Sequence, residues 1–279
     1  MITNPFDDDK LKEECALFGV FGHKDAAALT ALGAHVDTTV DDWTVTPGAF
    51  DRAAAIDCGL AGTVMRFVPP VAGLSTRRID FDGDAHMRTR PVGEILTALR
   101  GLGMTVDDGG RGALPFGIEG HGSVTGGTVV IDASASSQFV SALLLAGARY
   151  DHGVDVRHDG KPVPSLPHIE MTVGMLRARG VAVDDADANR WAVAPGRVAA
   201  RDETVEPDLS NAAPFVALAA VTGGRVVVRD WPQATTQAGD ALREILAAMG
   251  CSVAFVDDGH WRDILDVPEV IEALKTSRP

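Results

Sequence analysis

The chain has 279 residues, of which 46% are hydrophobic and 23% charged, as in a globular protein of one large or two medium domains. Its net charge of −14 argues against nucleic acid and anionic membrane as partners, but local arginines and helix N-termini can still hold a small anion. Apolar runs fall short of the roughly 18–20 residues that span a membrane. Three widely spaced cysteines and an N-terminus without a signal-peptide core predict a reduced, cytoplasmic chain without disulfides or a metal cluster.

In chain order, one signature recurs four times: a helical end with the pattern Leu-x-x-x-Gly or nearly so, a short apolar strand and a Val-Asp-Asp turn. The glycines of the four copies are Gly33, Gly103, Gly180 and Gly250. Each is expected to end its helix with a positive φ, and each Asp-Asp pair to form a hairpin turn. Strands are therefore predicted after the turns, at 43–45 and 191–193 among other places.

A second signature lies between these marks. Small or polar residues open apolar helices at 61–67, 134–139 and 210–215, and Gly-Gly followed by β-branched residues predicts strands at 126–131 and 223–228. The start of a helix has free N–H groups and a positive dipole end, which suit an anion. Because the marks recur at about 70 to 77 residues, which is longer than common solenoid repeats, we expect copies of one α/β unit around a shared axis. Near the C-terminus, the sequence after Asp266 predicts a helix to about Lys275.

Residues 34–260 resemble the EPSP synthase family (3-phosphoshikimate 1-carboxyvinyltransferase), most closely its actinobacterial type. The stretches that carry the resemblance are GLAGTVMRF at 59–67, RTRPV at 88–92, DASASSQF at 132–139, PSLPHI at 164–169 and EPDLSN at 206–211. The resemblance implies an α/β fold of repeated units, the enolpyruvyl transferase fold or inside-out α/β barrel, with the helices inside and the sheets outside. It also implies a second domain that is truncated here.

The segment at 5–33 resembles the N-terminus of amidophosphoribosyltransferase, a glutamine amidotransferase whose cysteine acts as N-terminal nucleophile. The stretch EECALFGVFGH at 13–23, with Cys15, carries this second resemblance. We therefore expect a foreign N-terminal segment at 1–33 and a shikimate-phosphate-binding domain at 34–204. The first unit of an incomplete second domain at 205–260 and an unrelated tail at 261–279 are expected to follow.

The resemblance implies transfer of the carboxyvinyl group of phosphoenolpyruvate to the 5-hydroxyl of shikimate 3-phosphate, without metal or organic cofactor. Two phosphorylated, carboxylated substrates require convergent cations together with amide and hydroxyl donors. By resemblance the residues that bind shikimate 3-phosphate are Ser136, Ser137, Gln138 and Ser165. Those that bind phosphoenolpyruvate are Gly62, Arg90 and again Gln138. For each serine the alternative is ordinary capping or a turn, and for Arg90 a solvated surface position.

Four other residues are weighed differently. Arg66 fits a structural ion-pairing role on its helix, and His168 matches a position near the substrate where relatives carry tyrosine. Asp208 is better explained as an N-cap than as a catalytic carboxylate. Pro91 biases Arg90 toward an extended backbone.

The sequence assigns no catalytic residue, because the family's lysine motif and acid/base carboxylate have no counterpart here. We therefore expect impaired or absent turnover, and the alternative hypothesis is a non-catalytic remnant with at most weak binding of shikimate 3-phosphate. A glutamine amidotransferase would rest on Cys15 alone, and the Ser-Ser-Gln helix start disfavours a transferase that acts on a UDP-sugar. The oligomeric state is not predicted.

Overall fold

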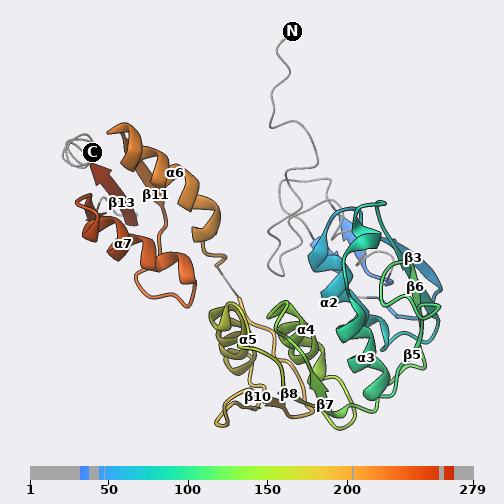
Figure 1. Ribbon diagram of the computed structural model, residues 1–279. Helices are drawn as coiled ribbons and strands as arrows, with labels where there is room; N and C mark the ends of the chain where they lie inside the picture. The colour runs from blue at the N-terminus through green and yellow to red at the C-terminus, as the bar shows by residue number, and fades with distance from the viewer. Residues whose placement is uncertain (1–31, 38–43, 47, 203, 258–260, 267–279) are drawn as a thin grey trace. The chain divides into compact units, whose positions relative to one another are not determined.

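The computed structural model describes residues 32–37, 44–46, 48–202, 204–257 and 261–266. The chain divides between Ala199 and Ala200 into two compact units, called unit 1 and unit 2 here (Figure 1). The sequence places this boundary a few residues later, between 204 and 205. Cys15 and the rest of the segment that resembles amidophosphoribosyltransferase lie outside the described residues, apart from 32 and 33.

Unit 1 contains two copies of one β-α-β-α-β-β sequence of elements. The first copy consists of β3 (Ala54–Asp57), α2 (Gly62–Ala72), β4 (Arg78–Asp82), α3 (Gly93–Gly101), β5 (Thr105–Asp107) and β6 (Phe116–Glu119). The second consists of β7 (Gly127–Ile131), α4 (Gln138–Gly147), β8 (Val154–His158), α5 (Leu166–Ala178), β9 (Val183–Asp184) and β10 (Arg190–Val193). Their sheets have the corresponding orders β3-β4-β6-β5 and β7-β8-β10-β9, each with one parallel pair at the start. The predicted repeat of an α/β unit is therefore confirmed.

Unit 2 repeats most of the same pattern. Its elements are α6 (Leu209–Thr222), β11 (Arg225–Arg229), the short 3-10 helix η3 (Ala238–Ala241), α7 (Leu242–Ala248), β12 (Ser252–Asp257) and β13 (Trp261–Asp266). The order β11-β13-β12 corresponds to β4-β6-β5 of unit 1. At the other end of the described chain, β1 (His35–Asp37) and β2 (Thr44–Thr46) form an antiparallel pair like the last two strands of a copy.

One expectation is corrected by the topology. The sequence assigns 261–279 to an unrelated tail, but β13 is the middle strand of the unit 2 sheet and pairs with β11 and β12. Without β13, the facing edges of β11 and β12 would leave backbone N–H and C=O groups without hydrogen-bond partners. The predicted helix after Asp266 lies outside the described residues.

The two Gly-Gly strands also differ in place. β7 precedes the first helix of its copy, whereas β11 follows the first helix of unit 2. The two dipeptides have different structural roles. Gly126 lies where a side chain would meet the backbone of Gly153, whereas Gly223 ends α6 with a φ of 71°. By contrast, the four glycines of the other signature all have positive φ, as predicted: Gly33 112°, Gly103 95°, Gly180 76° and Gly250 93°. The helix expected before Gly33 lies outside the described residues.

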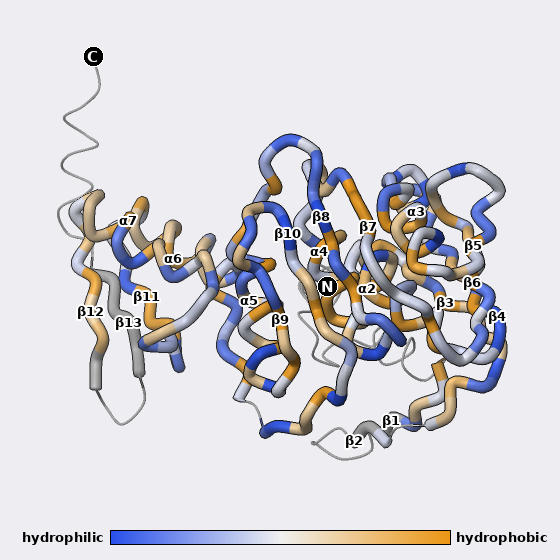
Figure 2. The backbone as a smooth tube through the Cα atoms, turned by 90° about the horizontal axis from the view of Figure 1, so that it is seen from below, coloured by the Kyte–Doolittle hydropathy of each residue, from blue (hydrophilic) through white to orange (hydrophobic). Residues whose placement is uncertain are grey.

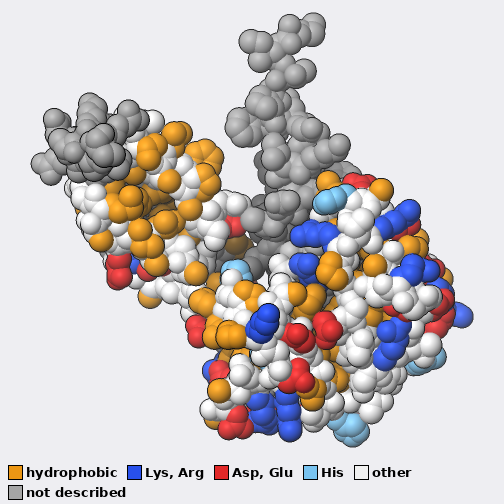
Figure 3. Space-filling view, in the orientation of Figure 1, with side chains coloured by type: hydrophobic (Ala, Val, Ile, Leu, Met, Phe, Trp, Pro, Cys, Tyr) orange, Lys and Arg blue, Asp and Glu red, His pale blue; other side chains and the backbone are white. Residues whose placement is uncertain are grey.

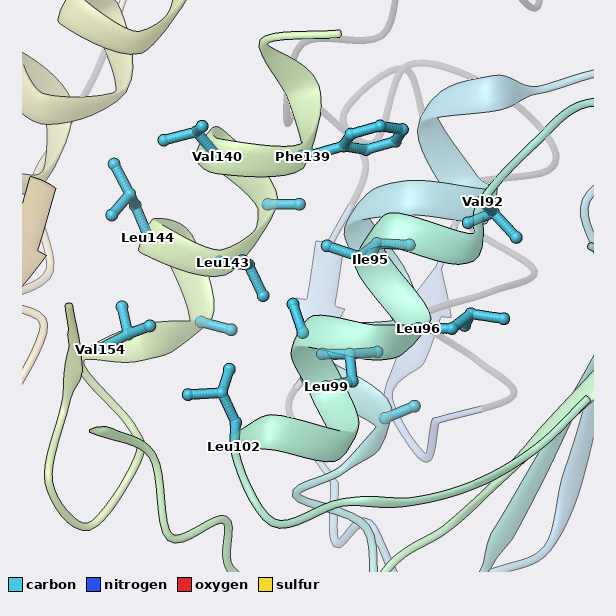
Figure 4. Close-up of a cluster of buried hydrophobic side chains, with 14 of the residues drawn as sticks. Val92, Ile95, Leu96, Leu99, Leu102, Phe139, Val140, Leu143, Leu144 and Val154 are labelled. Carbon is cyan, nitrogen blue, oxygen red and sulfur yellow. The ribbon is translucent and has the colours of Figure 1, made fainter. Parts of the chain in front are cut away.

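The helices of unit 1 lie inside and the sheets outside. Nearly every residue of α4 is buried, and its side chains join those of α3 in one apolar cluster (Figure 4). Figure 2 shows hydrophobic colours along α2 and α4. The sheets present alternate residues inward: on β4, Ile79 and Phe81 are buried, and Phe81 stacks on Phe116 at 4.9 Å between ring centroids. The expected inside-out α/β arrangement is thus confirmed.

Unit 2 has a much smaller core. Val216, Ala220, Leu246 and Cys251 form its buried cluster, whereas large apolar side chains of α6 and α7 are exposed to solvent (Figure 3). The exposed large apolar residues of these two helices and of the C-cap of α7 are Phe215, Leu218, Val221, Ile245 and Met249. In the repeat, Phe215 corresponds to Phe139 of α4, and their exposed fractions are 61% and 3%. Among the described residues, no helix has the length and apolar character that crossing a bilayer requires.

Candidate functional site

All predicted site residues of unit 1 follow the carboxyl ends of parallel strands. Asp57 at the end of β3 is level with Asp82 at the end of β4, and Ile131 of β7 is level with His158 of β8. The loops that leave neighbouring parallel strands begin at the same edge of the sheet, where open α/β sheets bind ligands. The loops after these four strands carry Gly62, Arg90, the Ser-Ser-Gln helix start and Ser165, respectively.

The loop from β3 to α2 is a tight turn held by backbone hydrogen bonds. The amide of Cys58 donates to the carbonyl of Asp82 at 2.7 Å, and the Asp57 carboxylate accepts from the amide of Gly59 at 2.9 Å. Gly59 has a φ of 50°, which glycine adopts without a steric penalty. Burial is the main reason that the pKa of Cys58 rises to about 12, with Asp57 and Asp82 adding to it. This thiol stays protonated near neutral pH and does not provide a nucleophile.

Gly62 opens α2 beneath two guanidinium groups. A Cβ atom at this position would lie 3.1 Å from Nη1 of Arg90 and 3.4 Å from Nη1 of Arg66. The missing side chain therefore leaves a small space faced by two cations at the positive end of a helix, which is an arrangement that favours an anion.

Arg90 lies on a loop that is anchored on both sides. Its backbone is extended, with φ −80° and ψ 128°, as Pro91 predicts. Just before it, the short 3-10 helix η2 (Met87–Thr89) buries Met87, and Arg88 grips Asp82 with two hydrogen bonds of 2.8 and 2.6 Å. The Arg88 hydrogen bond is the largest influence lowering the pKa of Asp82. The exposed guanidinium of Arg90 is thus carried by a defined backbone.

The start of α4 holds the Ser-Ser-Gln sequence. Ser136 accepts a hydrogen bond from the amide of Gln138 at 3.3 Å, so its hydroxyl has the capping role that was the alternative. Ser137 stands at the N-cap position, buried, and its hydroxyl makes no capping hydrogen bond. One of the two serines therefore keeps its hydroxyl free of a helix-capping function.

Arg66 and Gln138 join the two copies of the repeat. Nη1 of Arg66 donates to Oε1 of Gln138 at 2.6 Å, although the residues are 72 positions apart. At the other end of the same helices, the buried hydroxyl of Tyr150 donates to the carbonyl of Pro70 at 2.8 Å. The two contacts show that α2 and α4 run parallel, so that their N-termini lie together.

Ser165 precedes α5 in a left-handed conformation, with φ 55° and ψ 52°. Such a backbone is strained for a residue other than glycine, and strained residues gather at functional sites. Its side chain is exposed and does not cap the helix. α5 packs beside α4, where Thr172 donates to Ser141 at 2.9 Å. The structure thus places Ser165 on the neighbouring helix start, without a hydrogen bond to the other predicted site residues among the contacts described.

Comparison with known proteins identifies the family. Residues 23–271 match the family model of EPSP synthase (3-phosphoshikimate 1-carboxyvinyltransferase). The chain belongs to the EPSP synthase family. A relative from Kocuria rhizophila, named 3-phosphoshikimate 1-carboxyvinyltransferase, is 56% identical over 238 residues, which cover 81% of this chain and 54% of the relative.

Solved structures agree with this membership. EPSP synthase from Acinetobacter baumannii superposes with a TM-score of 0.66 at 26% identity, over 88% of this chain and 56% of that one. The enolpyruvyl transferase NikO from Streptomyces tendae shares the fold, with a TM-score of 0.61 at 17% identity over 88% of this chain and 56% of its own. The chain spans about half the length of these EPSP synthase relatives.

The family match is wider than the sequence resemblance on both sides. It includes residues 23–33, which also belong to the expected foreign segment, and residues 261–271 of the expected tail. Together with the pairing of β13, this places the first part of that tail within the EPSP synthase repeat. The resemblance of the N-terminal segment to amidophosphoribosyltransferase stays a prediction.

Arg66 is the residue whose role differs most from the one that the sequence predicted. The expected structural ion pair is absent among the described residues, where no carboxylate lies within 4.0 Å of Arg66 or of Arg90. Burial is the larger cause that lowers the pKa of Arg66, and the neighbouring charge of Arg90 is the other. The available signal was its spacing of four residues from Gly62, which puts both on one helix face.

Asp208 and His168 occupy less central positions. Asp208 is the N-cap of α6 in unit 2, where its carboxylate accepts from the amide of Asn211 at 3.0 Å, as predicted. His168 is exposed on the first turn of α5, and its amide donates to the carbonyl of Ser165 at 3.0 Å. Within the described ranges, His, Cys, Asp and Glu side chains form no group of three or more that could hold a metal ion.

Proposed function

We propose that this chain forms the shikimate 3-phosphate side of an enolpyruvyl transferase of the shikimate pathway. The reaction moves the carboxyvinyl group of phosphoenolpyruvate to the 5-hydroxyl of shikimate 3-phosphate. One observation carries the proposal: Arg90 and Arg66 converge on the space at Gly62 without a carboxylate partner among the described residues, and Arg66 also holds Gln138. Two cations beside two parallel helix starts favour ligands with several negative charges.

The phosphate of shikimate 3-phosphate is assigned to Ser136, Ser137, Gln138 and Ser165. The start of α4 supplies the positive end of a helix dipole, and hydroxyl and amide donors stand beside it. The left-handed backbone of Ser165 supports a ligand role for this exposed residue. In this assignment the ring of shikimate 3-phosphate lies over the starts of α4 and α5, within the domain that is predicted at 34–204.

Phosphoenolpyruvate is assigned to Gly62, Arg90 and Gln138. Arg90 can approach a carboxylate or phosphate with two parallel N–H groups, and its anchored loop limits the entropy lost on binding. The space at Gly62 lets an anion oxygen reach both guanidinium groups. Gln138 belongs to both substrate sites, because its amide carries two N–H donors.

We propose that the 279 residues alone bind substrate but catalyse its conversion poorly. The addition and elimination steps need a proton donor for the methylene carbon and a base for the hydroxyl. The residues assigned to the two substrates are glycine, arginine, serine and glutamine, and none of their side chains is a suitable base at neutral pH. One electrostatic donor alone is worth about 10²–10³ in rate. Without several of the charged groups that the family resemblance implies, turnover by these residues should be slower by far more than 10³-fold.

Calorimetric titration with shikimate 3-phosphate tests the site. Ser137→Ala and Gln138→Ala should each weaken binding by roughly tenfold or more, because each removes a hydrogen bond to a charged group. Ser210→Ala is the matched control, since Ser210 is exposed at the corresponding start of α6 in unit 2. Binding that both site variants leave unaltered would show that the phosphate is misplaced.

A second measurement separates an impaired enzyme from a non-catalytic remnant. Phosphate release is followed with both substrates present, and the same variants serve as controls for contaminating activity. Release that Gln138→Ala abolishes identifies slow turnover by this site. Release that is absent, while shikimate 3-phosphate still binds, identifies the remnant.

A further inference from the structure

The hydrogen bond between Arg66 and Gln138 has a direction. A guanidinium group carries only N–H donors, so the atom of Gln138 that faces it must be the carboxamide oxygen. The structure has this arrangement, with Oε1 of Gln138 2.6 Å from Nη1 of Arg66. The NH₂ end of the same carboxamide therefore points away from Arg66.

We propose that Arg66 is a positioning residue that keeps the Gln138 carboxamide turned so that its NH₂ group donates to the phosphorylated substrates. The proposal rests on the substrate assignment given above for Gln138. A carboxamide has two nearly isosteric ends, and in isolation either one can face an anion. With the oxygen outward, its partial negative charge would repel a phosphate or carboxylate. Arg66 disfavours that orientation, because a flipped carboxamide would place its NH₂ donors against the N–H donors of the guanidinium group.

Arg66 is itself well placed for this work. It lies one helical turn after Gly62, and its guanidinium lies 5.6 Å from the ring centroid of Phe139, the residue next to Gln138. Its Nε atom is buried and lacks a hydrogen-bond partner among the described residues. The side chain is thus confined between α2 and the first turn of α4, where it meets Gln138.

The charge environment strengthens the same arrangement. Arg66 is half-buried, and its burial, followed by the charge of the nearby Arg90, disfavours its charged form and lowers its pKa. An anion that enters the space at Gly62 relieves the repulsion between the two guanidinium groups. Ligand binding is therefore expected to favour the charged form of Arg66, the form that donates to Gln138.

A double-mutant cycle tests the proposal by calorimetry with shikimate 3-phosphate. Arg66→Met keeps a long apolar side chain without donors, and we expect it to weaken binding by roughly tenfold, similar to the loss from Gln138→Ala. Combined with Gln138→Ala, Arg66→Met should add less than about twofold, because its effect passes through Gln138. Losses that multiply in the double variant would overturn the proposal, since they would mean that Arg66 acts on the ligand independently.

Two further variants distinguish positioning from charge and from folding. Arg66→Lys retains a donor and a positive charge, and should recover most of the affinity that Arg66→Met loses. Arg149→Met removes one exposed arginine at the opposite end of α4, and its affinity should equal that of the wild type. If Arg149→Met weakens binding as much as Arg66→Met does, the effect is one of net charge and the proposal fails.

A ligand-independent readout keeps the inference separate from the proposed function. The side-chain ¹⁵N–¹H signals of Gln138, assigned by their loss in Gln138→Ala, should be resolved from those of solvent-exposed amides in the wild type and move to the exposed position in Arg66→Met. Signals that are the same in both proteins overturn the orientation. A chain with the expected signals that binds neither substrate would refute the proposed function and leave the orientation standing.

Discussion

Replacing Gly62 by alanine should separate ligand binding from stability. The added Cβ would lie 3.1 Å from Nη1 of Arg90 and 3.4 Å from Nη1 of Arg66, which are the ends of flexible side chains. These groups can yield by a few tenths of an ångström without moving the backbone. Gly62 is also the first residue of α2 and has no positive φ. Because alanine favours helix over glycine by up to about 1 kcal/mol, the free energy of unfolding should stay level or rise slightly.

The effect on ligands should be confined to phosphoenolpyruvate. The methyl group occupies the space that an anion oxygen would use to reach Arg90, so that one hydrogen bond to a charged group is lost. Such a bond is worth about 1.5–3 kcal/mol, which corresponds to roughly tenfold to a hundredfold in affinity. Shikimate 3-phosphate is assigned to the starts of α4 and α5, and its affinity should change by less than about threefold.

The assay is calorimetry with phosphoenolpyruvate in the presence of saturating shikimate 3-phosphate, together with urea denaturation. Gly174→Ala is the matched control, because Gly174 lies inside α5 and a Cβ there would have no atom within 4 Å. It should gain up to about 1 kcal/mol of stability and bind both ligands as the wild type does. A folded Gly62→Ala protein that binds phosphoenolpyruvate as tightly as the wild type would refute the assignment of this space.

Three further predictions concern single side chains. Tyr150→Phe removes the buried hydrogen bond to the carbonyl of Pro70 and should lower the free energy of unfolding by about 1–2 kcal/mol in urea denaturation; an unchanged midpoint would contradict this. Burial raises the pKa of Asp108, but hydrogen bonds from two loop amides and the charge of Arg100 outweigh it and lower the pKa overall. The stabilising contribution of the Asp108 carboxylate is therefore present above about pH 4, its pKa in the unfolded chain, and is lost as the pH falls further. Asp108→Asn should lower the free energy of unfolding by about 2 kcal/mol at pH 7, and the variant should lose less stability than the wild type between pH 5 and pH 3. Equal losses of stability in the two proteins over this pH range would contradict the prediction. Ser165→Gly relieves a left-handed backbone, so the unfolding free energy should hold or rise by about 1 kcal/mol while shikimate 3-phosphate binds at least about tenfold more weakly; unchanged affinity would exclude Ser165 from the site.

Much of the candidate site was predictable because its chemistry is local. Gly62, Arg90, the Ser-Ser-Gln helix start and Ser165 all occur where a turn follows a strand, and turn residues mark such places directly in the sequence. The extended backbone of Arg90 depends only on Pro91, and the positive φ of Gly103 only on its place at a helix end. The resemblance then supplied the substrates that these positions could bind.

Other features were undecided because the same residues serve different local structures. Gly-Gly begins a parallel strand at Gly127 and ends α6 at Gly223, and only the sheet topology distinguishes the two. Residues 261–266 follow the fourth Val-Asp-Asp mark, but only the sheet, in which β11 and β12 flank them, establishes that they form a strand.

The sequence by itself therefore determined the repeated α/β unit, the positions of its helix starts and the residue types offered there. These depend on interactions among neighbours in the chain, which periodicity, capping and turn chemistry express. Only the tertiary structure decided which helix starts meet. The parallel packing of α2 and α4 brings Arg66 to Gln138 across 72 residues, and a contact between such distant residues follows from packing rather than from any local pattern.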